Sequence, residues 1–187
     1  FRAGRPAIVG ESDCPQPLLD YAQTIGANLY RVGQDFSYSC SATHWCYRGK
    51  TLQLSGLPLP KLPQPNAATA IAVLEHLCAD IDDSIVANAV GTTQLAGRLE
   101  QLAAEPCVMV DVAHNPHAAR YLRSRLSQLK KARLFAICGM LKDKDAAAVL
   151  TELSIDVTHW YLTDLDVPRG ATAAALTALL PAQSQAS

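Results

Sequence analysis

The residues best suited to chemistry lie between positions 108 and 117, where the sequence reads VMVDVAHNPH. Asp111, His114 and Asn115 follow an apolar run, and Pro116 can begin a helix. A carboxylate, an imidazole and an amide at the carboxyl end of a strand are placed to bind a ligand, because ligands of open α/β sheets bind at that edge. This segment is therefore the first candidate binding site.

Two other interpretations of the segment remain open from its residues alone. Asp111 can end the strand while Asn115 caps the following helix, because Asn is a preferred N-cap residue. Alternatively, His114 and His117 can bind a metal ion with Asp111 as a third ligand, as in a metal-dependent hydrolase. Two histidines three positions apart across a proline turn are a weak metal motif, and no further Cys or His cluster accompanies them in the sequence. We expect no metal ligand here.

Three further segments have side chains that can bind small molecules. Asn66 precedes an alanine-rich apolar stretch, so its amide can cap a helix or bind the edge of a base. Arg98, in the sequence GRLE, has a planar guanidinium that suits phosphate oxygens, although a lone arginine can equally be a solvated surface residue. Lys142 and Lys144, in GMLKDKD, can hold a carboxylate or belong to a solvated run of charges.

The pattern of predicted secondary structure that positions these side chains changes after Gly97. Strand-like and helix-like segments then alternate, which is typical of a parallel sheet wrapped by helices. The right-handed crossover rule places the carboxyl ends of such strands at one edge of the sheet. We expect parallel neighbouring strands at Cys107–Val112, Arg133–Gly139 and Val157–Leu162, and helices at His117–Lys130, Asp145–Leu153 and Ala171–Leu180.

The part before Gly97 has a different pattern. A strand at Arg5–Gly10 and a helix at Pro15–Gly26 are followed by short alternating pieces at Asn28–Leu54, as antiparallel strands require. Residues 57–65 include four prolines, which predicts a stiff connector and excludes a helix until the last proline has passed. Two helices are then expected, at Ala67–Cys78 and at Asp82–Thr92.

Composition excludes several classes of function. The 187 residues have a formal net charge of −1 with scattered Lys and Arg, which gives no basic face for nucleic acid. No apolar run approaches the roughly 18 residues that span a bilayer, so the cytoplasm is the expected compartment. The six cysteines form no C-x-x-C and lie mostly in apolar runs, so we expect buried, reduced thiols.

Four of these motifs together resemble the folylpolyglutamate synthase and dihydrofolate synthase family, a branch of the Mur ligase superfamily. LPLPKLPQPNAATA, GRLE, DVAHNPHAA and GMLKDKD are similar to that family's motifs in their order and at about their spacing. DVAHNP is the most specific, because Mur ligases share a related form. The resemblance implies an α/β fold: part of a central ATPase domain with a small antiparallel meander at 1–96, then a Rossmann-like C-terminal domain with a mostly parallel sheet at 97–187.

The resemblance also implies an ATP-dependent, amide-forming ligase that joins L-glutamate to dihydropteroate or to folates, with ATP and Mg²⁺ as cofactors. Asn66 is implied to approach adenine, Arg98 to reach the phosphates, and Asp111 to bind the ribose hydroxyls or nearby nucleotide groups. His114 is implied to be catalytic, beside the nucleotide or the incoming glutamate, and Lys144 to hold a glutamate carboxylate. The expected partners are these small molecules, without nucleic acid or membrane, and a monomer is expected.

One part that such a ligase needs does not occur in the sequence. No G-x-x-x-x-G-K-[ST] loop is present to cradle the β- and γ-phosphates and help to bind Mg²⁺. The chain also opens on Phe1 without a methionine. We therefore expect a fragment that is inactive alone, with the metal ligands in a preceding part. The alternative is a nucleotide-binding or regulatory module without catalysis.

Overall fold

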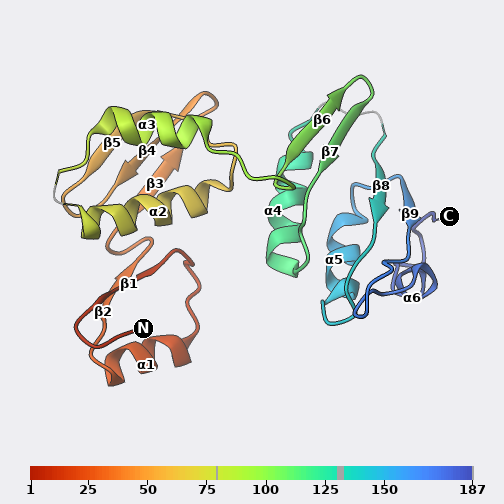
Figure 1. Cartoon of the computed structure of the whole chain (residues 1–187), viewed down its shortest axis with the longest axis horizontal. Helices are drawn as coiled ribbons and strands as arrows, with labels where there is room; N and C mark the ends of the chain where they lie inside the picture. Colours follow the sequence, from red (N-terminus) through yellow and green to blue (C-terminus); the bar gives the residue numbers. More distant parts are fainter. Residues whose placement is uncertain (79, 130–132, 187) are drawn as a thin grey trace. The chain divides into compact units, whose positions relative to one another are not determined.

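The chain folds as two compact units, Phe1–Arg98 and Leu99–Ser187, each with its own hydrophobic core (Figure 1). The computed structural model describes residues 1–78, 80–129 and 133–186. Lys130, the expected last residue of a helix, lies outside these ranges. Within them, no helix is long and apolar enough to cross a membrane.

The first unit combines a parallel strand pair with an antiparallel sheet of three strands. The meander expected from the sequence is confirmed for the last three strands, whereas residues 28–31 pair in parallel with the first strand instead. Its elements are β1 (Pro6–Val9), α1 (Gln16–Thr24), β2 (Asn28–Arg31), β3 (Ser37–Cys40), β4 (His44–Arg48), β5 (Gln53–Pro58), α2 (Gln64–Leu77) and α3 (Asp83–Thr92).

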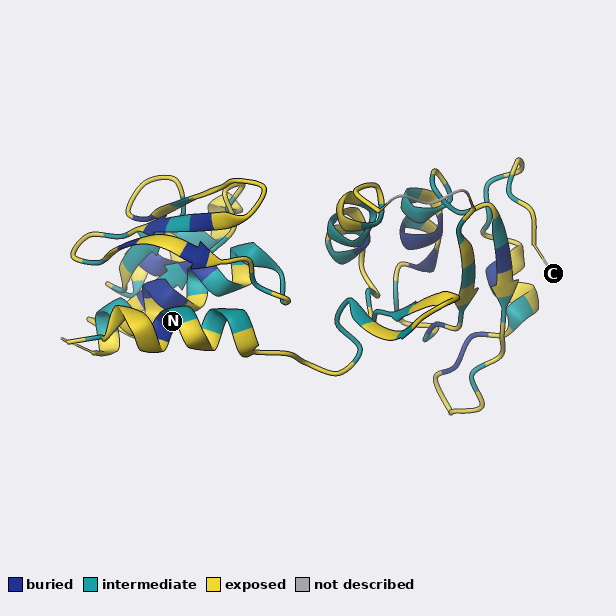
Figure 2. Ribbon diagram, turned by 90° about the horizontal axis from the view of Figure 1, so that it is seen from above, coloured by how far each residue is buried: buried dark blue, intermediate teal, exposed yellow. Residues whose placement is uncertain are grey.

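Alternation along β4 builds the core of this unit. Trp45 and Tyr47, two positions apart on one strand, face the same side and are 0% and 1% exposed. Ile71 of α2 and Val86 of α3 belong to the same buried cluster. Figure 2 colours the buried residues of each unit dark blue. Burying each of these large side chains contributes roughly 1.5–3 kcal/mol, so the sheet and both helices hold one another in place.

Helix α2 begins earlier than the sequence predicted. Pro65 and Asn66 both lie in its first turn, because a proline there loses an N–H that would have no helical partner in any case. Pro63 is the N-cap residue, and the N–H of Asn66 donates to the carbonyl of Pro63 at 2.9 Å. The interpretation of Asn66 as the helix cap is therefore wrong, and its amide is not used for that purpose.

The second unit alternates strands and helices as predicted. A β-hairpin, formed by its first two strands, precedes these elements in the sequence. β8 and β9 are parallel neighbours, which confirms two of the three expected strands. The expectation of a third parallel neighbour at Cys107–Val112 is wrong: β7 pairs antiparallel with β6, a strand that the sequence did not predict, in a sheet separate from that of β8 and β9. The elements are β6 (Glu100–Ala104), β7 (Cys107–Val110), α4 (Pro116–Leu126), β8 (Phe135–Cys138), α5 (Ala146–Leu153), β9 (His159–Leu162) and α6 (Ala173–Thr177).

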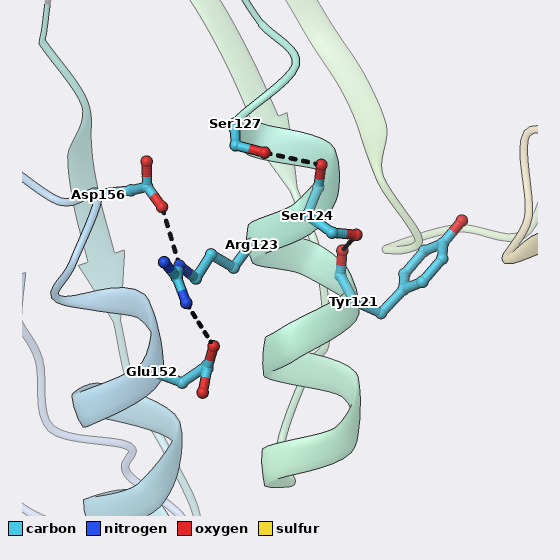
Figure 3. Close-up of polar contacts among 6 residues, drawn as sticks. All are labelled: Tyr121, Arg123, Ser124, Ser127, Glu152 and Asp156. Atoms are coloured by element: carbon cyan, nitrogen blue, oxygen red, sulfur yellow. Dashed lines mark hydrogen bonds and ion pairs between the residues drawn. The ribbon is translucent and has the colours of Figure 1, made fainter.

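Helices α4 and α5 are joined by one arginine that contacts two carboxylates. Arg123 of α4 donates from Nη1 to Glu152 of α5 at 3.0 Å and from Nε to Asp156 at 3.3 Å (Figure 3). Such partly exposed ion pairs contribute little to stability, but they favour one orientation of α4. That orientation matters because α4 begins beside the segment with Asp111 and His114.

The six cysteines are free, as expected, but none of them is buried. Cys14, Cys46 and Cys138 are half-buried, and the other three are exposed. The expectation of buried thiols is wrong. Four of the cysteines lie in short strands that are partly open to solvent, and Cys14 and Cys78 lie outside the strands and helices.

Candidate functional site

Asp111 lies directly after β7, and each of its carboxylate oxygens accepts a backbone hydrogen bond. Oδ2 accepts from the N–H of Leu99 at 2.9 Å, and Oδ1 accepts from the N–H of Ala113 at 2.7 Å. The first bond joins the GRLE turn to the DVAHNP segment. A hydrogen bond therefore connects two motifs that are separate in the sequence.

The GRLE turn has an uncommon backbone on both sides of Arg98. Gly97 has φ of 69° and Leu99 has φ of 46°, in the left-handed region that a leucine rarely adopts. The bond from Leu99 to Asp111 compensates for that conformation, and strained residues of this kind cluster at functional sites. Arg98 itself is half-buried, and its N–H donates to the carbonyl of Leu95 at 3.1 Å.

His114 is exposed, with Nδ1 at 2.9 Å from the carbonyl oxygen of Val112. A carbonyl can only accept, so Nδ1 must be the protonated nitrogen in this contact. Nε2 of the neutral ring is then an acceptor, because the hydrogen bond of one ring nitrogen sets the state of the other. The ring can therefore accept a proton or a hydrogen bond from a ligand at Nε2.

Asn115 is the N-cap of α4, as one interpretation of the sequence proposed. Its Oδ1 accepts from the N–H of Ala118 at 2.9 Å, and Pro116 occupies the first turn. The same interpretation, in which Asp111 only ends the strand, omits the contact of Asp111 with Leu99. Asn115 is thus a structural residue that sets where α4 begins.

Asn66 belongs to the first unit, and its side chain is exposed in the first turn of α2. Two residues earlier, the amide nitrogen of Gln64 is buried without a hydrogen-bond partner among the described residues. A buried N–H₂ of this kind is commonly satisfied by water or by a ligand. Gln64 is not among the site residues predicted from the sequence.

Lys144 lies in the loop between β8 and α5, where it contacts its neighbour Asp143. The Nζ atom is 3.5 Å from Oδ2 of Asp143, and Nη1 of Arg169, from the loop after β9, is 3.2 Å from the same oxygen. Partial desolvation acts to raise the pKa of Asp143, but its backbone hydrogen bond and the two cations outweigh this and lower the pKa. Sequence reasoning missed Arg169, because only the fold brings the two loops together.

Glu75 of α2 was also missed. Its carboxylate accepts from the N–H of Thr51, from the N–H of Leu52 at 2.9 Å, and from the hydroxyl of Tyr47 at 2.9 Å. Desolvation acts to raise the pKa of Glu75, but these hydrogen bonds outweigh it and lower the pKa, while burial and the Glu75 carboxylate raise the pKa of Tyr47. Glu75 therefore closes the β4–β5 turn onto α2 and is a structural residue.

The predicted site residues fall into separate groups. Contacts join Asp111 to Leu99 and Ala113 in one group, and Lys144 to Asp143 and Arg169 in another. Asn66 lies in the other unit. In the part of the chain that the structure describes, no group of three or more His, Cys, Asp or Glu residues could hold a metal ion.

Residues 97–186 match the family described as Mur ligase, glutamate ligase domain. A dihydrofolate synthase/folylpolyglutamate synthase of Escherichia coli is 43% identical over 174 residues, which cover 92% of this chain and 41% of that protein. The chain therefore spans less than half the length of this relative.

Solved structures of the same group of enzymes are similar to the whole of this chain. FolC of E. coli in complex with DHPP and ADP superposes with a TM-score of 0.93 at 40% identity, covering 100% of this chain and 45% of that one. A bifunctional folylpolyglutamate synthase/dihydrofolate synthase with Mn, AMPPNP and L-glutamate bound has a TM-score of 0.92 at 41% identity, with 100% and 45% covered.

Proposed function

Since this chain belongs to the folylpolyglutamate synthase and dihydrofolate synthase family of Mur ligases, we propose that it acts in the ATP-dependent ligation of L-glutamate to dihydropteroate or to folyl(poly)glutamate. The observation that carries this proposal is the 43% identity to a dihydrofolate synthase/folylpolyglutamate synthase over 92% of the chain. The contact between Asp111 and Leu99 supports it, because it assembles two of the recognised motifs.

In the proposed reaction, a substrate carboxylate attacks the γ-phosphorus of ATP, which gives an acyl phosphate and ADP. The α-amine of L-glutamate then attacks the acyl carbon, the bond from that carbon to the phosphate oxygen breaks, and inorganic phosphate leaves. The nitrogen loses a proton and an amide remains. The main task of the residues in this chain is to position the nucleotide and the amine.

Nucleotide binding is assigned to Asn66, Arg98 and Asp111. The amide of Asn66 offers a donor and an acceptor to adenine, and the guanidinium of Arg98 suits phosphate oxygens. Asp111 uses both oxygens for backbone N–H groups, yet a carboxylate has about four lone-pair sites and can still accept from ribose hydroxyls. Asp111 thus has two tasks: it shapes the turn that includes Arg98, and it binds the nucleotide.

His114 and Lys144 are assigned to the glutamate step. His114 has Nε2 free to accept when Nδ1 bonds to Val112, so it can take the proton that the attacking amine loses. Lys144 is proposed to hold a glutamate carboxylate with its ammonium group. No residue of the described part is assigned to Mg²⁺, since none of its acidic or histidine clusters fits a metal; the cation is expected to bind with the phosphates of ATP.

A second candidate is a nucleotide-binding or regulatory module without catalysis, which the lack of a G-x-x-x-x-G-K-[ST] loop favours. A chimeric protein distinguishes the ligase from the binding module. In this exchange protein, the matching segment of the E. coli relative is replaced by this chain, and the rate of ligation is measured. A ligase segment supports amide formation that requires both ATP and L-glutamate. If the chain is a binding module, the exchange protein should bind nucleotide but form no amide product.

A further inference from the structure

Strands β8 and β9 have one covered face and one open face. Side chains alternate along a strand, and paired residues of neighbouring strands share a face. The register pairs Phe135 with His159 and Ile137 with Tyr161, and we call the face with these four side chains the open face. Trp160 lies on the other face, where it is 1% exposed and belongs to a buried cluster with residues of α5.

The open face is apolar and accessible to solvent. Ile137 is 82% exposed, the highest value for a large hydrophobic residue in the part of the chain that the structure describes. Phe135 and Tyr161 are 50% and 46% exposed. The sequences of β8 and β9 include no Asp, Glu, Lys or Arg. An apolar patch of this kind on a globular protein marks an interaction site.

The covered face holds the open face in place. The ring of Trp160 donates from Nε1 to Oγ of Ser154 at 3.1 Å, and a parallel ladder joins β9 to β8. Because these contacts fix both strands, the side chains that point the other way start from a determined backbone. A partner that binds there loses little entropy in ordering the surface.

The residue types of the open face are those that anchor protein interfaces. The rings of His159 and Tyr161 are 4.9 Å apart, and the guanidinium of Arg133, just before β8, lies 5.3 Å from the centroid of the Phe135 ring. Aromatic residues and arginine are enriched in interfaces, whereas other charged residues are depleted at their centres. The patch therefore has an apolar centre at Ile137 and polar atoms at its margin.

The outer edge of β9 is a less suitable place for a partner than the open face. The N–H of Trp160 donates to the carbonyl of Gln185 at 2.9 Å, and Trp160 and Ala186 form a parallel bridge. The chain itself therefore occupies this edge at Trp160, where an added strand would otherwise pair. The exposures of Phe135 and Ile137 show that the described residues leave the open face uncovered.

We propose that the open face is an interface between two copies of this chain, which pack face to face about a twofold axis. Such an interface is self-complementary, because both copies contribute the same patch. Ile137 of each copy lies at the centre of the contact, with Phe135 and Tyr161 around it. A dimer replaces the monomer that was expected from the sequence.

The size of the patch suits a weak, specific dimer. The open face and Arg133 present roughly 500 Å² per copy, because about half of each side chain is exposed and large side chains have about 150–250 Å² each. Two copies then bury roughly 1,000 Å², which is the lower limit for a specific interface. We therefore expect a dissociation constant in the micromolar range.

The charges favour a second copy over a nucleic acid or an anionic membrane. Among the described residues of this patch, Arg133 is the only Lys or Arg, which is too few for a partner that is held by its phosphates. A second copy brings neither a carboxylate nor an ammonium group to the centre of the contact. No charge is then buried, and no desolvation penalty opposes association.

Sedimentation equilibrium of the 187-residue chain over the micromolar range tests the proposal. We expect a reversible monomer–dimer equilibrium, with backbone amide shifts at β8 and β9 that depend on protein concentration. Ile137→Lys places an ammonium group at the centre of the contact and should weaken dimerisation by at least about thirtyfold, the effect of losing a central interface residue. Ile137→Thr keeps the β-branched shape and should weaken it less.

The controls separate the interface from folding and from general effects of charge. Ile137 is in solvent in the single chain, so both variants should keep the melting temperature of the dilute wild type. Ile85→Lys makes the same substitution at an isoleucine of α3 that is 66% exposed, and it should leave dimerisation unchanged.

Three results would overturn the proposal. The first is a chain that stays monomeric throughout the micromolar range, and the second is a dimer that Ile137→Lys leaves intact, which would assign association to another surface. The third is a monomeric exchange protein whose melting temperature falls on Ile137→Lys, which would mean that a segment of the same polypeptide covers the open face. None of these measurements requires ligation, so they do not depend on the proposed function.

Discussion

The backbone N–H of Leu99 donates a 2.9 Å hydrogen bond to Oδ2 of Asp111, which fastens the turn with Arg98 to the segment with His114. An acidic residue proposed to bind nucleotide therefore also shapes the site. Substitutions of Asp111 should affect both stability and binding, whereas substitutions of Arg98 should affect binding alone. That difference makes the two roles separable by experiment.

Asp111→Ala removes the acceptors of two backbone N–H groups, so the free energy of unfolding of the second unit should fall by about 1–3 kcal/mol. Asp111→Asn keeps one carbonyl oxygen and should lose less. Amide hydrogen exchange at β8 and β9 measures this unit without interference from the first. Asn115→Ala, which removes a helix cap, should cost about 1 kcal/mol and serves as the comparison. Unchanged exchange in Asp111→Ala would mean that the carboxylate is solvated.

Arg98→Ala in the exchange protein should lower the rate of ligation by far more than it lowers stability. The reason is that the proposed charge-assisted bond to phosphate is lost while the core of either unit is untouched. Steady-state ligation rates and melting temperatures, measured on the same preparations, give the comparison. Arg125→Ala is the matched control and should change neither. A normal rate of ligation in Arg98→Ala would mean that Arg98 does not contact the phosphates.

Glu75 should make the stability of the first unit depend on pH. Its pKa is lower in the folded state than the ordinary value of 4.5, so its contribution is present above that value and is lost as the pH falls through the lowered folded-state pKa. Glu75→Gln should therefore cost about 1 kcal/mol at neutral pH and less in acid. Urea unfolding at pH 7 and at pH 3 tests this, with Asp13→Asn in an exposed bend as the control. An equal cost at both pH values would contradict it.

The isolated 187-residue chain should bind ATP weakly. In the proposed site, Asn66 and Asp111 each contribute a hydrogen bond to adenosine, but without a phosphate-cradling loop most of the binding energy of the triphosphate is absent. We expect a dissociation constant in the millimolar range or higher, about −4 kcal/mol, and no hydrolysis when Mg²⁺, a folate and glutamate are added. Calorimetric titration and a phosphate-release assay measure both. Micromolar binding would reveal a complete site in this chain.

Much of the second unit could be predicted because its segments have strong periodicity. β8, β9 and α5 were expected within a few residues of where they lie. β6 was not, because its sequence EQLAA has no β-branched or aromatic residue, and it forms a strand only by pairing with β7. The start of α2 differs from the prediction for a local reason: several prolines in a row favour extended backbone, yet proline is accepted in the first turn of a helix.

The sequence pointed to single candidate residues of the site but not to the contacts among them. Motifs pointed to Asp111 and Lys144, whose types suit the chemistry. The bond from Leu99 to Asp111 and the contact of Arg169 with Asp143 both link residues that are far apart in sequence, and only the fold brings them together. A pattern in one chain gives no sign of such pairs.

Amide formation by the exchange protein tests the central claim most directly. Mass spectrometry detects the product of dihydropteroate and L-glutamate, with omission of ATP or of glutamate as controls and with nucleotide binding measured in parallel. We predict a product larger than its acceptor by one glutamyl residue, formed only when both are present and strongly reduced by Arg98→Ala. A folded exchange protein that binds ADP but forms no amide would contradict the assignment of this chain to a ligase and favour a binding module.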